Sequence, residues 1–134
     1  MASKSEVKVL RDSKEWIQVL QPSPDGQKLA VGSHDNCIYV YDSSFNLMYK
    51  AHGHSSYITA VDWDESGCIM RSNSGDYELL FWDANGKQDA SGRSNYQDTK
   101  WATQTAKMAW TVEGIYPAGA DGTYVNSVCA SNDE

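Results

Sequence analysis

The sequence predicts an all-β fold built from repeated small antiparallel sheets that stack face to face, as in a radial propeller. Two observations predict it: an internal repeat, and short strands that are apolar on both faces. When the chain is shifted by 41 positions, aromatic residues, a turn glycine and aspartates align with residues of the same kind. The aligned pairs are Trp16 with Tyr57, Gly26 with Gly67, Asp35 with Asp76, and Tyr41 with Trp82. A fixed period of this length is typical of folds made of repeated supersecondary units.

The first copy of the repeat is expected at residues 16–52, after a lead-in at 1–15. Strands are predicted at 16–20, 28–33, 37–42 and 46–51. β-branched and aromatic residues dominate the third of these runs, and short strands at such close spacing indicate an all-β unit. The turn between the first two strands ends in Gly26, which supplies a positive φ that other residues resist. Since the third strand is apolar on both faces, its sheet needs a neighbour on each side.

The second copy is expected at residues 53–95, with strands at 57–63, 68–72 and 77–83. An insertion at 96–123 should hold one strand, at 101–110, and loops, and residues 124–134 resemble the start of a third copy. Insertions on a repeat scaffold form surface loops where binding often resides. A structural elaboration without a ligand is an equally good interpretation of this segment.

Composition and charge exclude several classes of protein. The 134 residues carry a formal net charge of −7, and no clustered lysines and arginines offer the face that a nucleic-acid partner requires. No apolar run approaches the roughly 20 residues that cross a bilayer, so no membrane partner is expected. Cys37, Cys68 and Cys129 have the spacing of neither a disulfide framework nor a metal cluster. We interpret them as reduced cytosolic thiols.

Two residue pairs in the second copy resemble the signature of the WD-repeat family. Gly53-His54 precedes the first strand, and Trp82-Asp83 closes the third. In that family a histidine, a strand serine, a turn aspartate and a tryptophan form a structural hydrogen-bonded network. The matching positions are His54, Ser72, Asp76 and Trp82. The chemistry suits such a network, because a serine hydroxyl can accept from the indole N–H and donate onward, and an imidazole can donate to a carboxylate.

A metal site on His52 and His54 is the alternative, but no spaced set of further ligands accompanies them. The first copy keeps Asp35, whereas Val31 stands at the serine position and Tyr41 at the tryptophan position. We therefore expect that copy to rely more on packing.

No nucleophile elbow, phosphate-binding loop or dinucleotide fingerprint occurs in the sequence. We expect no catalytic residue, cofactor or metal, and therefore no enzyme. Acid pairs such as Asp62 with Asp64 fall in or beside a turn and are interpreted as solvated carboxylates.

Longer stretches resemble one branch of the WD-repeat proteins, the echinoderm microtubule-associated protein-like family. These stretches are residues 29–36, 53–63, 72–78, 98–103 and 114–123. The resemblance implies a non-enzymatic, microtubule-associated protein of the cytoplasm and cytoskeleton, with tubulin or microtubules as partner. The alternative is a general protein–protein interaction scaffold that binds another protein on its loops, at 90–95 or 116–121, without microtubules.

The chain holds two copies and the start of a third, whereas a closed ring usually has about seven blades. We therefore expect an incomplete ring: a fragment, a truncated product, or a chain that pairs with further propeller blades in cis or trans. Such a chain should leave an apolar blade face and strand edges exposed.

Overall fold

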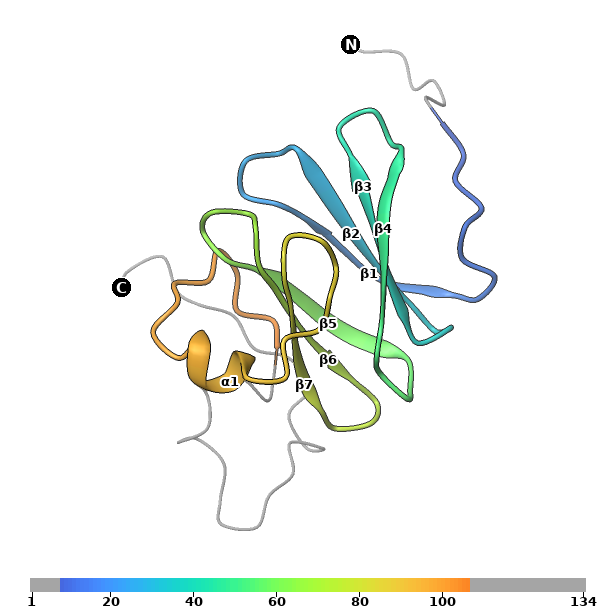
Figure 1. Ribbon diagram of the computed structural model, residues 1–134. Helices are drawn as coiled ribbons and strands as arrows, with labels where there is room; N and C mark the ends of the chain where they lie inside the picture. The colour runs from blue at the N-terminus through green and yellow to red at the C-terminus, as the bar shows by residue number, and fades with distance from the viewer. Residues whose placement is uncertain (1–7, 107–134) are drawn as a thin grey trace.

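The computed structural model describes residues 8–106, which form two antiparallel β-sheets (Figure 1). The four-stranded sheet, blade one, has the order β1 (Ile17–Pro22), β2 (Lys28–Ser33), β3 (Cys37–Asp42) and β4 (Leu47–His52). The three-stranded sheet, blade two, has the order β5 (Ile58–Trp63), β6 (Met70–Ser74) and β7 (Leu79–Trp82), and the short helix α1 (Gly92–Asn95) follows it. The predicted all-β propeller-blade class is confirmed. The predicted start of a third copy lies outside the described residues.

Both blades make the same turn between their first two strands. Gly26 and Gly67 each adopt a φ of 71°, the left-handed conformation that the turn requires. In blade two the side chain of Asp64 accepts hydrogen bonds from the N–H groups of Cys68 and Ile69, both at 2.9 Å. These two residues therefore stay in the turn, and β6 begins at Met70 instead of the predicted position 68.

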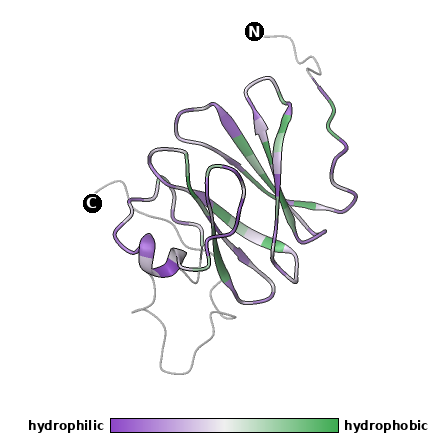
Figure 2. Ribbon diagram, viewed as in Figure 1, coloured by the Kyte–Doolittle hydropathy of each residue, from purple (hydrophilic) through white to green (hydrophobic). Residues whose placement is uncertain are grey.

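The main apolar core lies between the two blades. Hydrophobic stretches occur along strands of both blades in Figure 2. Blade one contributes Ala30, Ile38, Val40 and Ala51, and blade two contributes Ile58, Val61, Trp63, Met70 and Trp82. Two hydrogen bonds also join the blades. The Trp63 indole N–H donates to the Gln21 carbonyl at 3.0 Å, and the Lys28 ammonium donates to the Gly67 carbonyl at 2.8 Å.

The outer face of blade one carries a second, smaller apolar cluster. Val31, Cys37, Tyr39 and Tyr41 are buried there, and Leu10 and Leu29 pack against them. Both faces of β3 are thus buried, as its sequence predicted. The cover by the lead-in is incomplete, because Ile17 and Leu20 remain exposed and a hollow of about 240 Å³ opens between residues 10–15 and strands β1 to β3.

The outer face of blade two is covered by the chain that follows β7 (Figure 1). Gly92 of α1 lies so close to Phe81 that it leaves no room for a side chain. The rings of Tyr96 and Trp101 then pack at 5.6 and 6.0 Å from the Phe81 ring. The exposed apolar face that we expected is therefore absent from the described part of blade two. Within residues 8–106, blade one keeps such a face.

The predicted strand at 101–110 is wrong for its described part, residues 101–106. Trp101 forms only an isolated bridge with Asp64, and the N–H groups of Thr105 and Ala106 donate to the Asp62 carboxylate instead of a strand ladder. Residues 107–110 lie outside the described residues. No helix within residues 8–106 is both long enough and apolar enough to cross a membrane.

Candidate functional site: the His54 network and two carboxylate clusters

The structure brings the four residues of the predicted network together on the face of blade two that meets blade one. His54 precedes β5, Ser72 lies in β6, Asp76 in the next turn, and Trp82 at the end of β7. The Trp82 indole N–H donates to Ser72 Oγ at 2.8 Å. Ser72 Oγ lies 2.7 Å from His54 Nε2, and His54 Nδ1 lies 2.9 Å from Asp76 Oδ2.

The direction of each hydrogen bond follows from the chemistry of the groups. An indole N–H only donates and an ionised carboxylate only accepts. With a neutral imidazole, His54 therefore donates from Nδ1 to Asp76 and accepts the Ser72 hydroxyl proton at Nε2. His54, Ser72 and Trp82 are almost fully buried. Each hydrogen bond therefore gives a partner to a polar group that would otherwise be buried without one.

The same geometry bears on the metal alternative. The ligand atoms of His54, Asp76 and Glu78 lie within 4.8 Å of one another, a spacing that could hold an ion. Both ring nitrogens of His54 already have hydrogen-bond partners, and a metal would have to displace one of them. The arrangement therefore favours a hydrogen-bonded histidine over a ligated one.

Asp76 is held by backbone donors as well as by His54. Burial acts to raise the pKa of Asp76, but the N–H groups of Glu78 and Ser55 and the His54 imidazole outweigh it and keep the pKa below its usual value. Both N–H contacts are 2.9 Å long. The aspartate thus fixes the β6–β7 turn and the start of blade two at once.

Blade one has a different network around Asp35, where we expected mainly packing. Ser13 stands at the position of His54, and its hydroxyl lies 2.6 Å from that of Ser33 and 3.4 Å from Asp35 Oδ2. The Tyr39 hydroxyl donates to Asp35 Oδ2 at 2.6 Å. Tyr41, at the tryptophan position, turns to the lead-in and donates to Asp12 at 2.8 Å. Blade one therefore keeps the aspartate and its backbone donor, since the Cys37 N–H donates to Asp35 as the Glu78 N–H donates to Asp76. The side chains that donate to the carboxylate are different.

The cysteines in the described residues, Cys37 and Cys68, are free thiols. The sulfur of Cys37 lies 3.3 Å from His52 Nδ1, an arrangement that superficially resembles a nucleophile with its base. Burial raises the pKa of the Cys37 thiol, and the nearby Asp35 carboxylate raises it further. A buried thiol with a raised pKa is a poor nucleophile, so this pair lacks the activation that catalysis requires. Cys129 lies outside the described residues.

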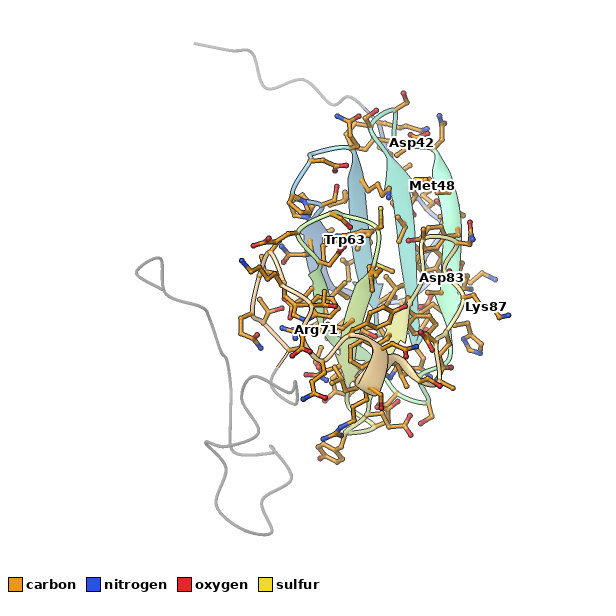
Figure 3. All side chains as sticks on the ribbon, turned by 60° about the vertical axis from the view of Figure 1, so that its left-hand side comes forward. Asp42, Met48, Trp63, Arg71, Asp83 and Lys87 are labelled. Atoms are coloured by element: carbon orange, nitrogen blue, oxygen red, sulfur yellow. The ribbon has the colours of Figure 1, made fainter. Side chains whose placement is uncertain are left out.

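Blade two also holds a buried ion pair between Asp62 and Arg71, so the prediction that Asp62 and Asp64 are solvated carboxylates is wrong. Asp62 is fully buried, and its Oδ2 accepts from Arg71 Nε at 3.1 Å. Thr103, Thr105 and Ala106 complete its coordination by hydrogen bonds. The guanidinium of Arg71 also donates to Gln104 and lies 4.4 Å from the centre of the Trp101 ring. Figure 3 shows Arg71 on blade two.

Asp64, in the turn beside Asp62, is also buried. Its carboxylate accepts a hydrogen bond from a backbone N–H of that turn instead of being solvated. One signal could have identified the pair. Asp62 stands between Val61 and Trp63 inside a strand, a position where a carboxylate needs a partner. Arg71 is the sole basic residue between positions 62 and 83, and it lies on the adjacent strand of the hairpin.

Comparisons with known proteins agree with this architecture. The family model described as the echinoderm microtubule-associated protein second β-propeller matches residues 1–134. The β-propeller domain of Cps50 (Swd1) from Myceliophteria thermophila aligns with a TM-score of 0.54 and 25% identity, over 59% of this chain and 24% of that one.

Curated relatives are similar over most of this chain. The ciliary WD repeat-containing protein ctxp80 of Euplotoides octocarinatus is 48% identical, over 90% of this chain and 17% of that protein. Echinoderm microtubule-associated protein-like 3 of Homo sapiens is 44% identical, over 92% of this chain and 14% of its own length. The 77 kDa echinoderm microtubule-associated protein of Lytechinus variegatus is 42% identical, over 91% of this chain and 19% of its own length. This chain spans less than a fifth of each of these three proteins, and it belongs to the echinoderm microtubule-associated protein family, within the second β-propeller of that family.

Proposed function

We propose that this chain is a non-enzymatic part of a microtubule-associated propeller of the cytoplasm and cytoskeleton, with tubulin or microtubules as its partner. The observation that carries the proposal is the match of the second-propeller family model over residues 1–134. The names of two relatives describe them as microtubule-associated. Among residues 8–106, the buried polar side chains described above have structural roles. His54 and Asp76 are hydrogen-bonded at the β6–β7 turn. Asp62 and Arg71 form an ion pair that also binds the segment after β7.

The distribution of charge indicates which part of the chain should contact tubulin. The chain carries a net charge of −7, and the acidic surface of tubulin should repel most of it. The cluster of basic side chains near the start of the chain is the exception: Lys4, Lys8, Arg11 and Lys14. The Lys8 ammonium donates to the carbonyl of Phe45 in the β3–β4 turn at 2.8 Å. Arg11 and Lys14 are exposed.

Co-sedimentation with stabilised microtubules tests the proposal. At modest salt the chain should appear in the pellet, and the bound fraction should not fall when the acidic tubulin tails are removed, since those tails repel it. The double variant Arg11→Gln, Lys14→Gln should bind more weakly. Lys87→Gln, which removes one exposed positive charge in the β7–α1 connection, serves as the matched control. A chain that stays in the supernatant with both kinds of microtubule contradicts the proposal.

We also propose that other propeller blades, in cis or trans, complete blade one. Its outer face keeps Ile17 and Leu20 exposed beside the hollow of about 240 Å³. In blade two the face at the same repeat position, which carries Trp82, packs against blade one. Equivalent faces of a repeat array have equivalent neighbours, so a preceding blade is the natural occupant of the blade-one face.

A scaffold role without microtubules is the second candidate, and one observation favours it. Exposed aromatic side chains gather at one end of the two blades, as is typical of protein interaction surfaces. In this case a partner protein should be captured equally well in the absence of microtubules.

A further inference from the structure

Three aromatic rings form a continuous row at one end of the two blades. Trp16 immediately precedes β1, His34 lies in the β2–β3 turn, and Tyr57 immediately precedes β5. The Trp16 and His34 rings are 5.8 Å apart, and the His34 and Tyr57 rings stack at 4.7 Å with an interplanar angle of 19°. The row therefore runs from blade one onto blade two.

The row is exposed, yet its rings are held in place. Trp16 is 79% exposed and Tyr57 43%, which is unusual for large rings in contact with their neighbours. The His34 N–H donates to the Trp16 carbonyl at 2.8 Å, and the His34 ring lies 3.2 Å from the side-chain oxygen of Gln18. Tyr57 rests on Gly75, where an added Cβ would lie 2.7 Å from its ring. A preformed row loses little entropy when a partner binds.

The charges around the row select the partner. The turns that carry the rings, residues 13–18, 33–36, 53–57 and 74–78, contain four carboxylates and one amine. Asp35 and Asp76 are engaged inside the blades, whereas Glu15 and Glu78 are exposed. Aromatic faces with free carboxylates beside them attract cations. Stacked nucleotide bases would bring phosphates to a surface that lacks the basic groups to neutralise them.

We propose that this row, Trp16, His34 and Tyr57, is a docking surface for an arginine-bearing segment of another protein. A guanidinium can stack flat on a ring and bind a carboxylate with its edge, which a lysine ammonium does less well. Glu15, next to Trp16 in the sequence, and Glu78, three positions after the Gly75 that Tyr57 contacts, are the exposed carboxylates for that edge. The inference does not rest on microtubule association.

Isothermal titration of the full chain tests it. The probe is the peptide acetyl-Gly-Arg-Gly-Arg-Gly-Arg-amide, and its control is the same peptide with citrulline, which keeps the shape and removes the charge. The arginine peptide should bind, should weaken as salt rises, and should bind more tightly than both the citrulline peptide and an oligothymidylate of similar length.

Variants locate the binding. Trp16→Ala and Tyr57→Ala should each weaken binding of the arginine peptide by about fivefold, and Glu78→Gln should weaken it in the same direction. The control Met48→Ala removes an apolar side chain that is 47% exposed in β4, near the opposite end of blade one, and should leave binding unchanged. Far-UV circular dichroism checks that each variant is folded.

Several results would overturn the proposal. They are no binding of the arginine peptide, equal binding of the citrulline peptide, tighter binding of the oligothymidylate, or wild-type affinity in both folded ring variants. Loss of binding to the same extent in Met48→Ala would also overturn it, because the effect would then not belong to the row.

Discussion

Ser72 is the residue on which the buried network of blade two depends, since its single hydroxyl accepts from Trp82 and donates to His54. Replacing His54 with alanine leaves the Ser72 hydroxyl and the Asp76 carboxylate without this partner in a buried site. We expect His54→Ala to lower the free energy of unfolding by about 1–3 kcal/mol. Urea unfolding at pH 7 measures this, with Ser55→Ala as control, because the Ser55 side chain is exposed. Equal unfolding midpoints for His54→Ala and wild type would show that the network contributes nothing.

Asp76 gives the network a dependence on pH. Its pKa is lower in the folded chain than its usual value, so its contribution to stability is complete above the usual value and is lost as the pH falls through the folded-state pKa. The difference in unfolding free energy between wild type and Asp76→Asn should therefore be large at pH 7 and shrink towards pH 3. A difference that stays constant from pH 7 to pH 3 would contradict this assignment.

Arg71 and Asp62 form the second buried polar site. Replacing Arg71 with methionine keeps most of its length but leaves Asp62 charged and fully buried without its ion-pair partner. Breaking one side of a buried pair costs about 3–5 kcal/mol, so Arg71→Met should unfold at a much lower denaturant concentration. The control Lys87→Met changes an exposed side chain and should shift the midpoint little. If both variants unfold together, the pair does not anchor the segment after β7.

Gly32 of β2 lies in close contact with β5 of the other blade and with β1 of its own. A Cβ added at Gly32 would lie 2.7 Å from Ile58 Cγ2 and 3.2 Å from Val19 Cβ. Gly32→Ala should therefore push the blades apart and cost about 1–3 kcal/mol by overpacking. Thermal unfolding measures the loss, and Ser44→Ala in the exposed β3–β4 turn is its control. An unchanged melting temperature for Gly32→Ala would mean that β2 and β5 are less tightly packed than described.

Elements whose own side chains determine them were predicted well from the sequence. β2 and β3 have the predicted bounds, because each lies between two turns with clear signals and β3 is rich in β-branched and aromatic residues. Elements that depend on distant partners were not. Residues 101–106 have strand-like composition, but Asp62, about 40 positions earlier in the chain, takes the N–H groups that a strand would use. The helix α1 has only four residues, too few for a periodic pattern to indicate it.

The candidate site follows the same rule. The repeat and the family resemblance together identified His54, Ser72, Asp76 and Trp82, which lie close together in the structure. The partners of Asp35 could not be predicted, because Ser13 and Tyr39 have no counterpart of the same kind in blade two. The aromatic row was missed for a similar reason, since its rings come from three separate turns.

The two blades differ in what covers their faces. The inner face of blade one packs on blade two, whereas the face of blade two at the same repeat position is closed by residues 92–106. The outer face of blade one remains partly open, with Leu20 63% exposed. We propose that this open face receives another propeller blade.

Light scattering across a concentration series tests whether the face of blade one is open to another blade. With no other blade present, the open faces should associate, so the mass should rise above the 14.9 kDa of one chain as concentration increases. Leu20→Asp, which places a carboxylate on the outer face, should return the mass to 14.9 kDa while circular dichroism stays unchanged. A wild-type chain that remains at 14.9 kDa at every concentration and binds no hydrophobic dye would contradict the claim.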